Sequence, residues 1–211
     1  PRSRQRVGAQ GAEGLGFGIK GMDMAEYQTI GVIGAGAWGT ALAQSAAQAG
    51  RKVTLWAYEA EVVEAVNVQH ENTIFLPGAS LNPAIIASSD PADLAKCDAF
   101  LMVAPAQHAR SILTQFAPHI ADGAPVLLCA KGFERESLAL MTDVLRETVP
   151  HAVPAVLSGP SFAIDVAKGL PTAVTLACED QQMGEALMEA VGSKTFRPYW
   201  SSDLVGAEVG G

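Results

Sequence analysis

The sequence has little concentrated positive charge. It contains 14 lysines and arginines against 22 aspartates and glutamates, for a formal net charge of -8, and no cluster of basic residues lies in the body of the chain. A protein that binds nucleic acid or inserts into an anionic membrane surface needs such a cluster to concentrate positive potential. The sequence therefore argues against both kinds of partner.

Cysteine is also scarce. The 3 cysteines, Cys97, Cys129 and Cys178, are far apart and lie among apolar residues, without a CxxC or histidine-rich spacing. An odd number of isolated cysteines supports neither a disulfide scaffold nor a zinc site. We therefore expect no bound metal and a cytoplasmic, reducing environment.

Long apolar runs are missing as well. Hydrophobic residues make up 49% of the chain and charged residues 17%, and 21 glycines and 12 prolines interrupt the apolar segments. This composition is too apolar for a disordered chain and too interrupted for a membrane span. The 211 residues are enough for one large domain, or for one domain and part of another.

Residues 1–28 differ in composition from the rest. They contain six glycines, four basic residues and three acidic residues, and they show no sustained apolar pattern. Because an apolar segment of useful length is missing, they do not form a secretory signal. We interpret them as a flexible leader or a cloning-derived extension, with Met22 or Met24 as the natural start, and assign residues 29–211 to the folded domain.

From Thr29 onward, short apolar runs alternate with longer alanine-rich or amphipathic stretches. The alternation predicts an α/β fold with a doubly wound, mainly parallel, Rossmann-type sheet. Strands are expected at Thr29–Ile33, Lys52–Trp56, Ala84–Ala87, Ala99–Val103, Pro125–Cys129, Ala155–Leu157, Thr172–Ala177 and Thr195–Tyr199. Helices are expected at Thr40–Ala49, Glu59–Val68, His108–Phe116, Ser137–Thr148 and Gln181–Val191. Residues 69–83 have no period and predict a long loop, whose length suggests a role.

A glycine-rich segment between the first strand and the first helix has the GxGxxG spacing. In this pattern Gly34 permits a tight turn, Gly36 lets a pyrophosphate approach the backbone, and Gly39 allows close contact between helix and strand. The anion would meet free backbone N–H groups and the positive end of the helix dipole. A flexible glycine turn is the simpler alternative, but the strand before it, the helix after it and the following strand favour a dinucleotide site.

An acidic residue about 20 positions after the last glycine completes this pattern, because its carboxylate can accept hydrogen bonds from the adenosine ribose. Glu59 stands at that position, after the second predicted strand. The alternative is a glutamate that merely begins a helix, where acids are favoured. The neighbouring Tyr58 is neutral, so this position offers no positive charge to the 2′-phosphate of NADP. We therefore expect a preference for NAD over NADP.

Two further segments follow predicted strands, at the sheet edge where ligands of open parallel sheets bind. Lys131 follows the strand that ends at Cys129, and it could stabilise the negative charge that hydride transfer places on a substrate oxygen. An ordinary solvated lysine is the alternative. Ser161 follows the strand that ends at Leu157; it could cap the next helix, and this role is compatible with a functional one.

Four segments together resemble the NAD(P)-dependent sn-glycerol-3-phosphate dehydrogenase family of bacterial type. They are Gly34–Ala43 (GAGAWGTALA), Lys131-Gly132, Leu157–Ala163 (LSGPSFA) and Gly169–Ala173 (GLPTA), within a resemblance that runs from about Ile30 to the last residue. The resemblance implies the reversible reduction of dihydroxyacetone phosphate to sn-glycerol 3-phosphate for glycerophospholipid synthesis. It places cofactor contacts on Ala37, Trp38, Tyr58, Lys131 and Ala163, and substrate contacts on Lys131, Gly159 and Ser161.

The sequence also departs from the family pattern. Many relatives carry a basic residue at the position of Tyr58, and the pattern after Tyr199 should lead into an all-helical domain, with a catalytic lysine and an Arg-Asn phosphate clamp, that is absent from this chain. The resemblance implies a homodimer at full length, and we expect this chain alone to bind NAD or NADP without turnover. The alternatives are a 6-phosphogluconate or β-hydroxyacid dehydrogenase and a non-catalytic dinucleotide-binding module.

Overall fold

The computed structural model describes residues 27–210, so most of the predicted leader lies outside the described residues. Within them, eight strands form one sheet in the order β3-β2-β1-β4-β5-β6-β7-β8. All neighbouring strands are parallel except β6 and β7, which confirms the prediction of a mainly parallel sheet. The strands are β1 (Thr29–Ile33), β2 (Lys52–Trp56), β3 (Ile85–Ser88), β4 (Ala99–Met102), β5 (Pro125–Leu128), β6 (Val153–Ser158), β7 (Thr172–Ala177) and β8 (Phe196–Ser201).

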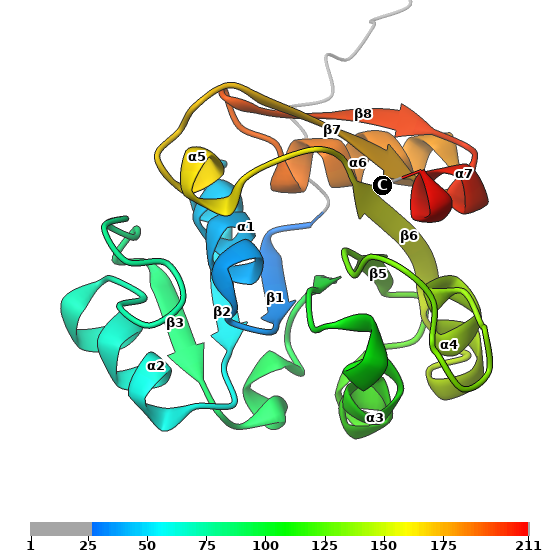
Figure 1. Cartoon of the computed structure of the whole chain (residues 1–211), viewed down its shortest axis with the longest axis horizontal. Helices are drawn as coiled ribbons and strands as arrows, with labels where there is room; N and C mark the ends of the chain where they lie inside the picture. Colours follow the sequence, from blue (N-terminus) through cyan, green and yellow to red (C-terminus); the bar gives the residue numbers. More distant parts are fainter. Residues whose placement is uncertain (1–26, 211) are drawn as a thin grey trace, which may run out of the picture.

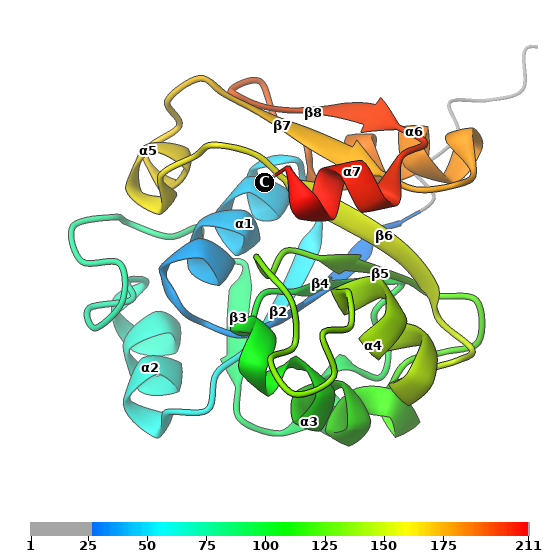
Figure 2. The same cartoon turned by 45° about the vertical axis from the view of Figure 1, so that its right-hand side comes forward.

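Helices cover both faces of the sheet (Figures 1 and 2). The helices are α1 (Ala37–Gln48), α2 (Ala60–Glu64), α3 (Ala106–Phe116), α4 (Met141–Thr148), α5 (Ala163–Ala167), α6 (Gln181–Val191) and α7 (Leu204–Val209). Short turns of other helix types are η1 (Ala65–Gln69), η2 (Pro91–Leu94) and η3 (Ala117–His119). In residues 27–210, no helix combines the length and the apolar character needed to cross a bilayer.

Two apolar cores lie on opposite sides of the sheet. Alternate strand residues such as Val32 and Leu101 pack in the core beneath α1 and α6, whereas Ile33 and Met102 pack in the core beneath α3 and α4. Ala41, Ala43, Ala46 and Ala47 of α1 are buried there, and their small side chains let the helix lie close to the sheet. The start of α1 is thereby fixed relative to the end of β1.

The order of the strands reverses beside β1, and this reversal positions the candidate site. The chain runs outward from β1 through β2 to β3, and then returns to place β4 on the other side of β1. The loops that leave β1 and β4 therefore diverge at the carboxyl edge of the sheet, which leaves a crevice between them.

Some local predictions differ from the structure. Helix α4 begins at Met141 instead of Ser137, because Leu138 has a left-handed backbone, with φ of 60°, that ends any helical run through it. Ser161 does not cap α5, whose N-cap is Phe162 without a side-chain hydrogen bond. The predicted second helix changes from α-helix to a π-helical turn at Ala65 and ends at His70, which also has a positive φ.

Candidate functional site

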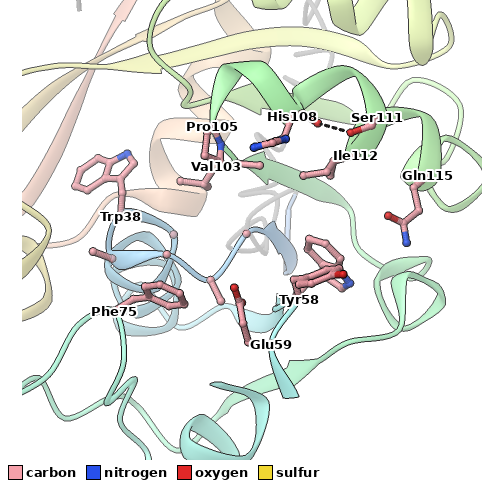
Figure 3. Close-up of a pocket in the computed structure, with 17 residues that line it drawn as sticks. Trp38, Tyr58, Glu59, Phe75, Val103, Pro105, His108, Ser111, Ile112 and Gln115 are labelled. Atoms are coloured by element: carbon pink, nitrogen blue, oxygen red, sulfur yellow. Dashed lines mark hydrogen bonds between the residues drawn. The ribbon is translucent and has the colours of Figure 1, made fainter. Parts of the chain in front are cut away.

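A cleft of about 760 Å³ opens at the strand reversal (Figure 3). Its size is within the range of small-molecule sites. Three carboxyl-end segments form most of its walls: the glycine turn after β1, the end of β2, and the segment from β4 into α3. The lining residues are Gly34, Ala35, Gly36, Ala37, Trp38, Gly39, Trp56, Tyr58, Glu59, Phe75, Val103, Ala104, Pro105, His108, Ser111, Ile112 and Gln115.

Each of the three positions of the turn requires or favours glycine for a different geometric reason. Gly34 has φ of 113°, which side-chain-bearing residues rarely adopt. Gly36 is exposed, and a Cβ added to it would meet no atom within 4 Å, so its open side is available to a ligand. A Cβ on Gly39 would lie 1.8 Å from the carbonyl oxygen of Gly34, so α1 can start this close to β1 only with glycine there.

The first turn of α1 presents unpaired backbone donors to the cleft. Gly36 is the N-cap, no side chain caps the helix, and its first turn carries no acidic residue. The first N–H groups of a helix have no partner inside it, and together with the helix dipole they attract an anion. Ala37 and Trp38 line the cleft from this turn, and the Trp38 ring packs edge-on to Phe196 at a centroid distance of 6.3 Å.

The end of β2 forms the second wall. Tyr58 is 81% exposed, and Glu59 is the N-cap of α2 but makes no capping hydrogen bond with its side chain. Figure 3 shows the Glu59 carboxylate directed into the cleft. Glu59 therefore both lines the cleft and begins α2, a position compatible with both interpretations drawn from the sequence.

The third wall contains lining residues that sequence reasoning did not single out. Pro105 follows β4 as the N-cap of α3, and His108, Ile112 and Gln115 line the cleft from successive turns of that helix. The Ser111 hydroxyl donates to the carbonyl oxygen of His108 at 3.0 Å and so stays within its own helix. Attention to the carboxyl end of every strand, including β4, would have found this segment.

The remaining predicted site residues lie outside the lining of this cleft. Lys131 is exposed in the segment after β5, and Gly159 and Ser161 follow the neighbouring strand β6. Because β5 and β6 are parallel, both segments leave the sheet at the same edge as the cleft. Ala163 begins α5, which lies beside α1 (Figure 1).

The segment that carries Lys131 is tied to the cleft wall. Arg110 of α3 donates two hydrogen bonds of 2.8 Å to the two carboxylate oxygens of Glu134, and the Gln107 amide donates to the carbonyl oxygen of Phe133 at 2.8 Å. The hydrogen bonds from Arg110 and Ser137 lower the pKa of Glu134 to about 2. The carboxylate therefore stays ionised and keeps the segment attached to α3 at neutral pH.

The cysteines and the possible metal ligands of residues 27–210 complete the description of the ionisable groups. Burial raises the pKa of the Cys97 thiol to about 11 and also raises the pKa values of Cys129 and Cys178. Protonated thiols are poor nucleophiles. In residues 27–210, histidine, cysteine and carboxylate side chains do not gather in groups of three or more that could hold a metal ion.

Comparisons with known proteins agree with this geometry. Residues 29–184 match the family model described as NAD-dependent glycerol-3-phosphate dehydrogenase N-terminus. The chain is 64% identical over 188 residues to a glycerol-3-phosphate dehydrogenase [NAD(P)+] of Maricaulis maris, covering 89% of this chain and 56% of the relative. It is 62% identical over 185 residues to the protein of that name from Caulobacter vibrioides, covering 88% and 56%.

A solved structure, the glycerol-3-phosphate dehydrogenase of Coxiella burnetii, superimposes with a TM-score of 0.80 at 34% identity. The match covers 86% of this chain and 56% of that protein. The chain thus spans about half the length of the relatives it matches.

Proposed function

The chain belongs to the family of NAD-dependent glycerol-3-phosphate dehydrogenase N-terminal domains, and on that premise we propose that it is the dinucleotide-binding part of an oxidoreductase. The proposed reaction interconverts dihydroxyacetone phosphate and sn-glycerol 3-phosphate by hydride transfer. The carrying observation is the cleft at the uncapped start of α1, with Gly36 open toward it. Family membership favours this function over the two alternatives considered from the sequence.

The residues of the cleft fit a nicotinamide dinucleotide. The backbone N–H groups of Ala37 and Trp38 would bind the pyrophosphate, and Gly36 would let it approach. The Glu59 carboxylate would accept hydrogen bonds from a ribose hydroxyl, and the apolar side chain of Ile112 would contact the base. When bound, the nicotinamide ring supplies or accepts the hydride.

Residues at the adjoining strand ends would act on the substrate. Lys131 would donate a hydrogen bond to the substrate oxygen and stabilise the charge that develops there. Gly159 and Ser161 would contact the substrate, and Ala163 the cofactor, as the family resemblance implies. Close packing also favours glycine at position 159, since a Cβ there would lie 3.1 Å from the Cα of Val174.

We propose that NAD is preferred over NADP. The Glu59 carboxylate would repel a 2′-phosphate, and Tyr58 offers no compensating cation. Arg51 and Lys52 stand at the start of β2, at the other edge of the sheet, and Arg51 is engaged with Glu189 at 3.5 Å.

Dissociation constants for NADH and NADPH, measured at one ionic strength, test this preference. The double variant Tyr58→Arg, Glu59→Ser should reduce or reverse the difference between the two dissociation constants. The control Glu61→Ser should leave this difference unchanged, because Glu61 lies on the first turn of α2 but outside the cleft lining. Tighter NADPH binding by the unmodified chain would show that the role given to Glu59 is wrong.

The role of Lys131 is tested by kinetics in a protein of the full length of its relatives. Lys131→Ala should lower kcat strongly and NADH affinity only modestly, because its charge acts on the developing oxyanion. Lys96→Ala is the matched control, since Lys96 is an exposed lysine that precedes β4 at the other edge of the sheet. Loss of NADH affinity with kcat intact would assign Lys131 to the cofactor.

The chain of 211 residues should bind NADH but show hardly any turnover of dihydroxyacetone phosphate, because it spans only 56% of its relatives' length. Robust turnover by this chain would contradict the proposal. The proposed setting is a cytoplasmic homodimer that supplies glycerophospholipid synthesis; the buried, unpaired cysteines support a reducing compartment. Analytical ultracentrifugation of the longer protein tests the dimer.

A further inference from the structure

The loop between η1 and β3 holds a buried asparagine against the glycine turn. Asn72 has 0% of its surface exposed. Its amide nitrogen donates two hydrogen bonds of 2.8 Å, one to the carbonyl oxygen of Ala35 and one to the hydroxyl of Thr40. The Thr40 hydroxyl in turn donates to the same Ala35 carbonyl at 3.3 Å. One backbone carbonyl in the middle of the GxGxxG segment is therefore fixed by two side-chain donors.

Fixing this carbonyl also fixes the direction of the next N–H group. A peptide bond is planar, and in the trans form its C=O and N–H point in opposite directions. The described residues contain no cis peptide bond. Because the Ala35 carbonyl points inward to Asn72, the N–H of Gly36 points outward, on the exposed side of the turn.

The same amide holds a second part of the cleft. The side-chain oxygen of Asn72 accepts a hydrogen bond from the backbone N–H of Phe75 at 3.0 Å. The backbone carbonyl oxygen of Asn72 accepts a second one from the N–H of Leu76 at 2.9 Å. Phe75 lines the cleft. Both amide hydrogens and the oxygen of the Asn72 side chain are thus used, and they join Phe75 to the glycine turn.

We propose that Asn72 is a positioning residue for the diphosphate group of the dinucleotide. Its amide aims the Gly36 N–H at the diphosphate and holds Phe75 beside it, although the Asn72 side chain is buried behind the turn and does not touch the ligand. The inference rests on the proposed function, because it needs a dinucleotide in the cleft. A buried asparagine that only stabilises the loop would not set the affinity of the site.

The variant Asn72→Asp tests the role with almost no change in shape. The carboxylate keeps an acceptor for Phe75 but replaces both donors, so an oxygen faces the Ala35 carbonyl and the turn loses its orientation. NADH affinity, followed by nucleotide fluorescence at about pH 8, should fall by about tenfold or more. Burial and the facing Ala35 carbonyl oxygen disfavour the ionised form of this carboxylate and so raise its pKa. At about pH 5.5 it regains one O–H donor, and most of the affinity should return.

The wild-type chain, measured at the same pH values, corrects for any effect of pH on binding that does not arise at residue 72; Glu59 and His108 are ionisable side chains that line the same cleft. The matched control is Asn67→Asp. Asn67 also bridges backbone groups, donating to the carbonyl oxygen of Ala87 at 2.9 Å and accepting from its N–H at 2.8 Å, but it lies away from the glycine turn. This control should lower the melting temperature and leave NADH affinity unchanged.

The possible outcomes distinguish a failure of the role proposed for Asn72 from a failure of the proposed dinucleotide binding. If wild type binds NADH and folded Asn72→Asp binds it equally well at both pH values, Asn72 does not position the site. If Asn72→Asp does not fold, Asn72→Ser decides, since its single, shorter hydroxyl adds no charge but cannot replace both amide donors: a severalfold loss of affinity supports the inference, and wild-type affinity overturns it. If wild type itself does not bind NADH, the proposed function fails first.

Discussion

Gly36→Ala should weaken NADH binding and Gly39→Ala should destabilise the fold, although both add one methyl group to the same turn. At Gly36 the new Cβ would meet no protein atom within 4 Å, so the folded chain accepts it. At Gly39 the Cβ would lie 1.8 Å from the Gly34 carbonyl oxygen, where real Cβ contacts essentially never fall below 3.0 Å. Helix α1 would have to move by at least the difference, 1.2 Å.

The magnitudes follow from these contacts. Overpacking costs about 1–3 kcal/mol, and Gly39→Ala should reach the upper end, about 3 kcal/mol of unfolding free energy, because backbone lies on both sides of the contact. Gly36→Ala should change stability by less than about 0.5 kcal/mol, since lower entropy of the unfolded chain offsets the weaker N-cap. In binding, its Cβ would displace the diphosphate from at least one N–H donor. A hydrogen bond to a charged group contributes about 1.5–3 kcal/mol, which corresponds to a loss of about tenfold to hundredfold in affinity.

Urea denaturation and NADH titration of both variants separate the two effects. Gly36→Ala should unfold like wild type and bind NADH weakly, whereas Gly39→Ala should unfold at lower urea. Each variant is the other's control for the addition of a methyl group. Wild-type affinity in folded Gly36→Ala would refute the placement of the diphosphate, and wild-type stability in Gly39→Ala would refute the close contact of α1 with Gly34.

Two further predictions concern acid stability and thiol reactivity. Because hydrogen bonds from Arg110 lower the pKa of Glu134 to about 2, the ionised carboxylate stabilises the fold above its ordinary pKa of 4.5, and this contribution is lost as pH falls toward 2. Melting temperatures of Glu134→Gln should therefore fall less steeply than wild type between about pH 5 and pH 2.5, and parallel curves would contradict the assignment. The three buried cysteines should not react with a thiol reagent at about pH 8 until the chain unfolds; rapid labelling of native protein would show that their burial is wrong.

The strands were the most predictable part of the fold. Strands buried on both faces are continuous apolar runs, so their positions are visible locally, and β1 has the predicted bounds, Thr29–Ile33. The start of α4 was not predictable, because the residues before it are held by partners distant in sequence. The Glu134 carboxylate accepts a hydrogen bond from Arg110, and the backbone carbonyl oxygen of Glu134 accepts one from the N–H of Leu138 at 2.8 Å. Local helix propensity at Ser137 cannot reveal these contacts.

The candidate site also contains residues that local sequence predicts and residues that only the folded structure brings together. The glycine turn is a local feature, and its spacing together with the strand before it and the helix after it predicted a dinucleotide site. Phe75 and His108 reach the cleft only through the arrangement of separate segments. Asn72 had no sequence signal, because asparagine is common in polar loops and only the folded structure shows that this one is buried against Ala35.

The contact between Gly39 and Gly34 has an evolutionary consequence. At this contact no side chain stands between the start of α1 and the end of β1, because Gly39 meets the Gly34 carbonyl oxygen directly. Residues at the end of β2, such as Tyr58 and Glu59, can therefore be exchanged during divergence without moving that end. Under the proposed function, selection or a protein engineer can change the preference between the two nicotinamide cofactors at those residues without altering the backbone proposed to bind the diphosphate.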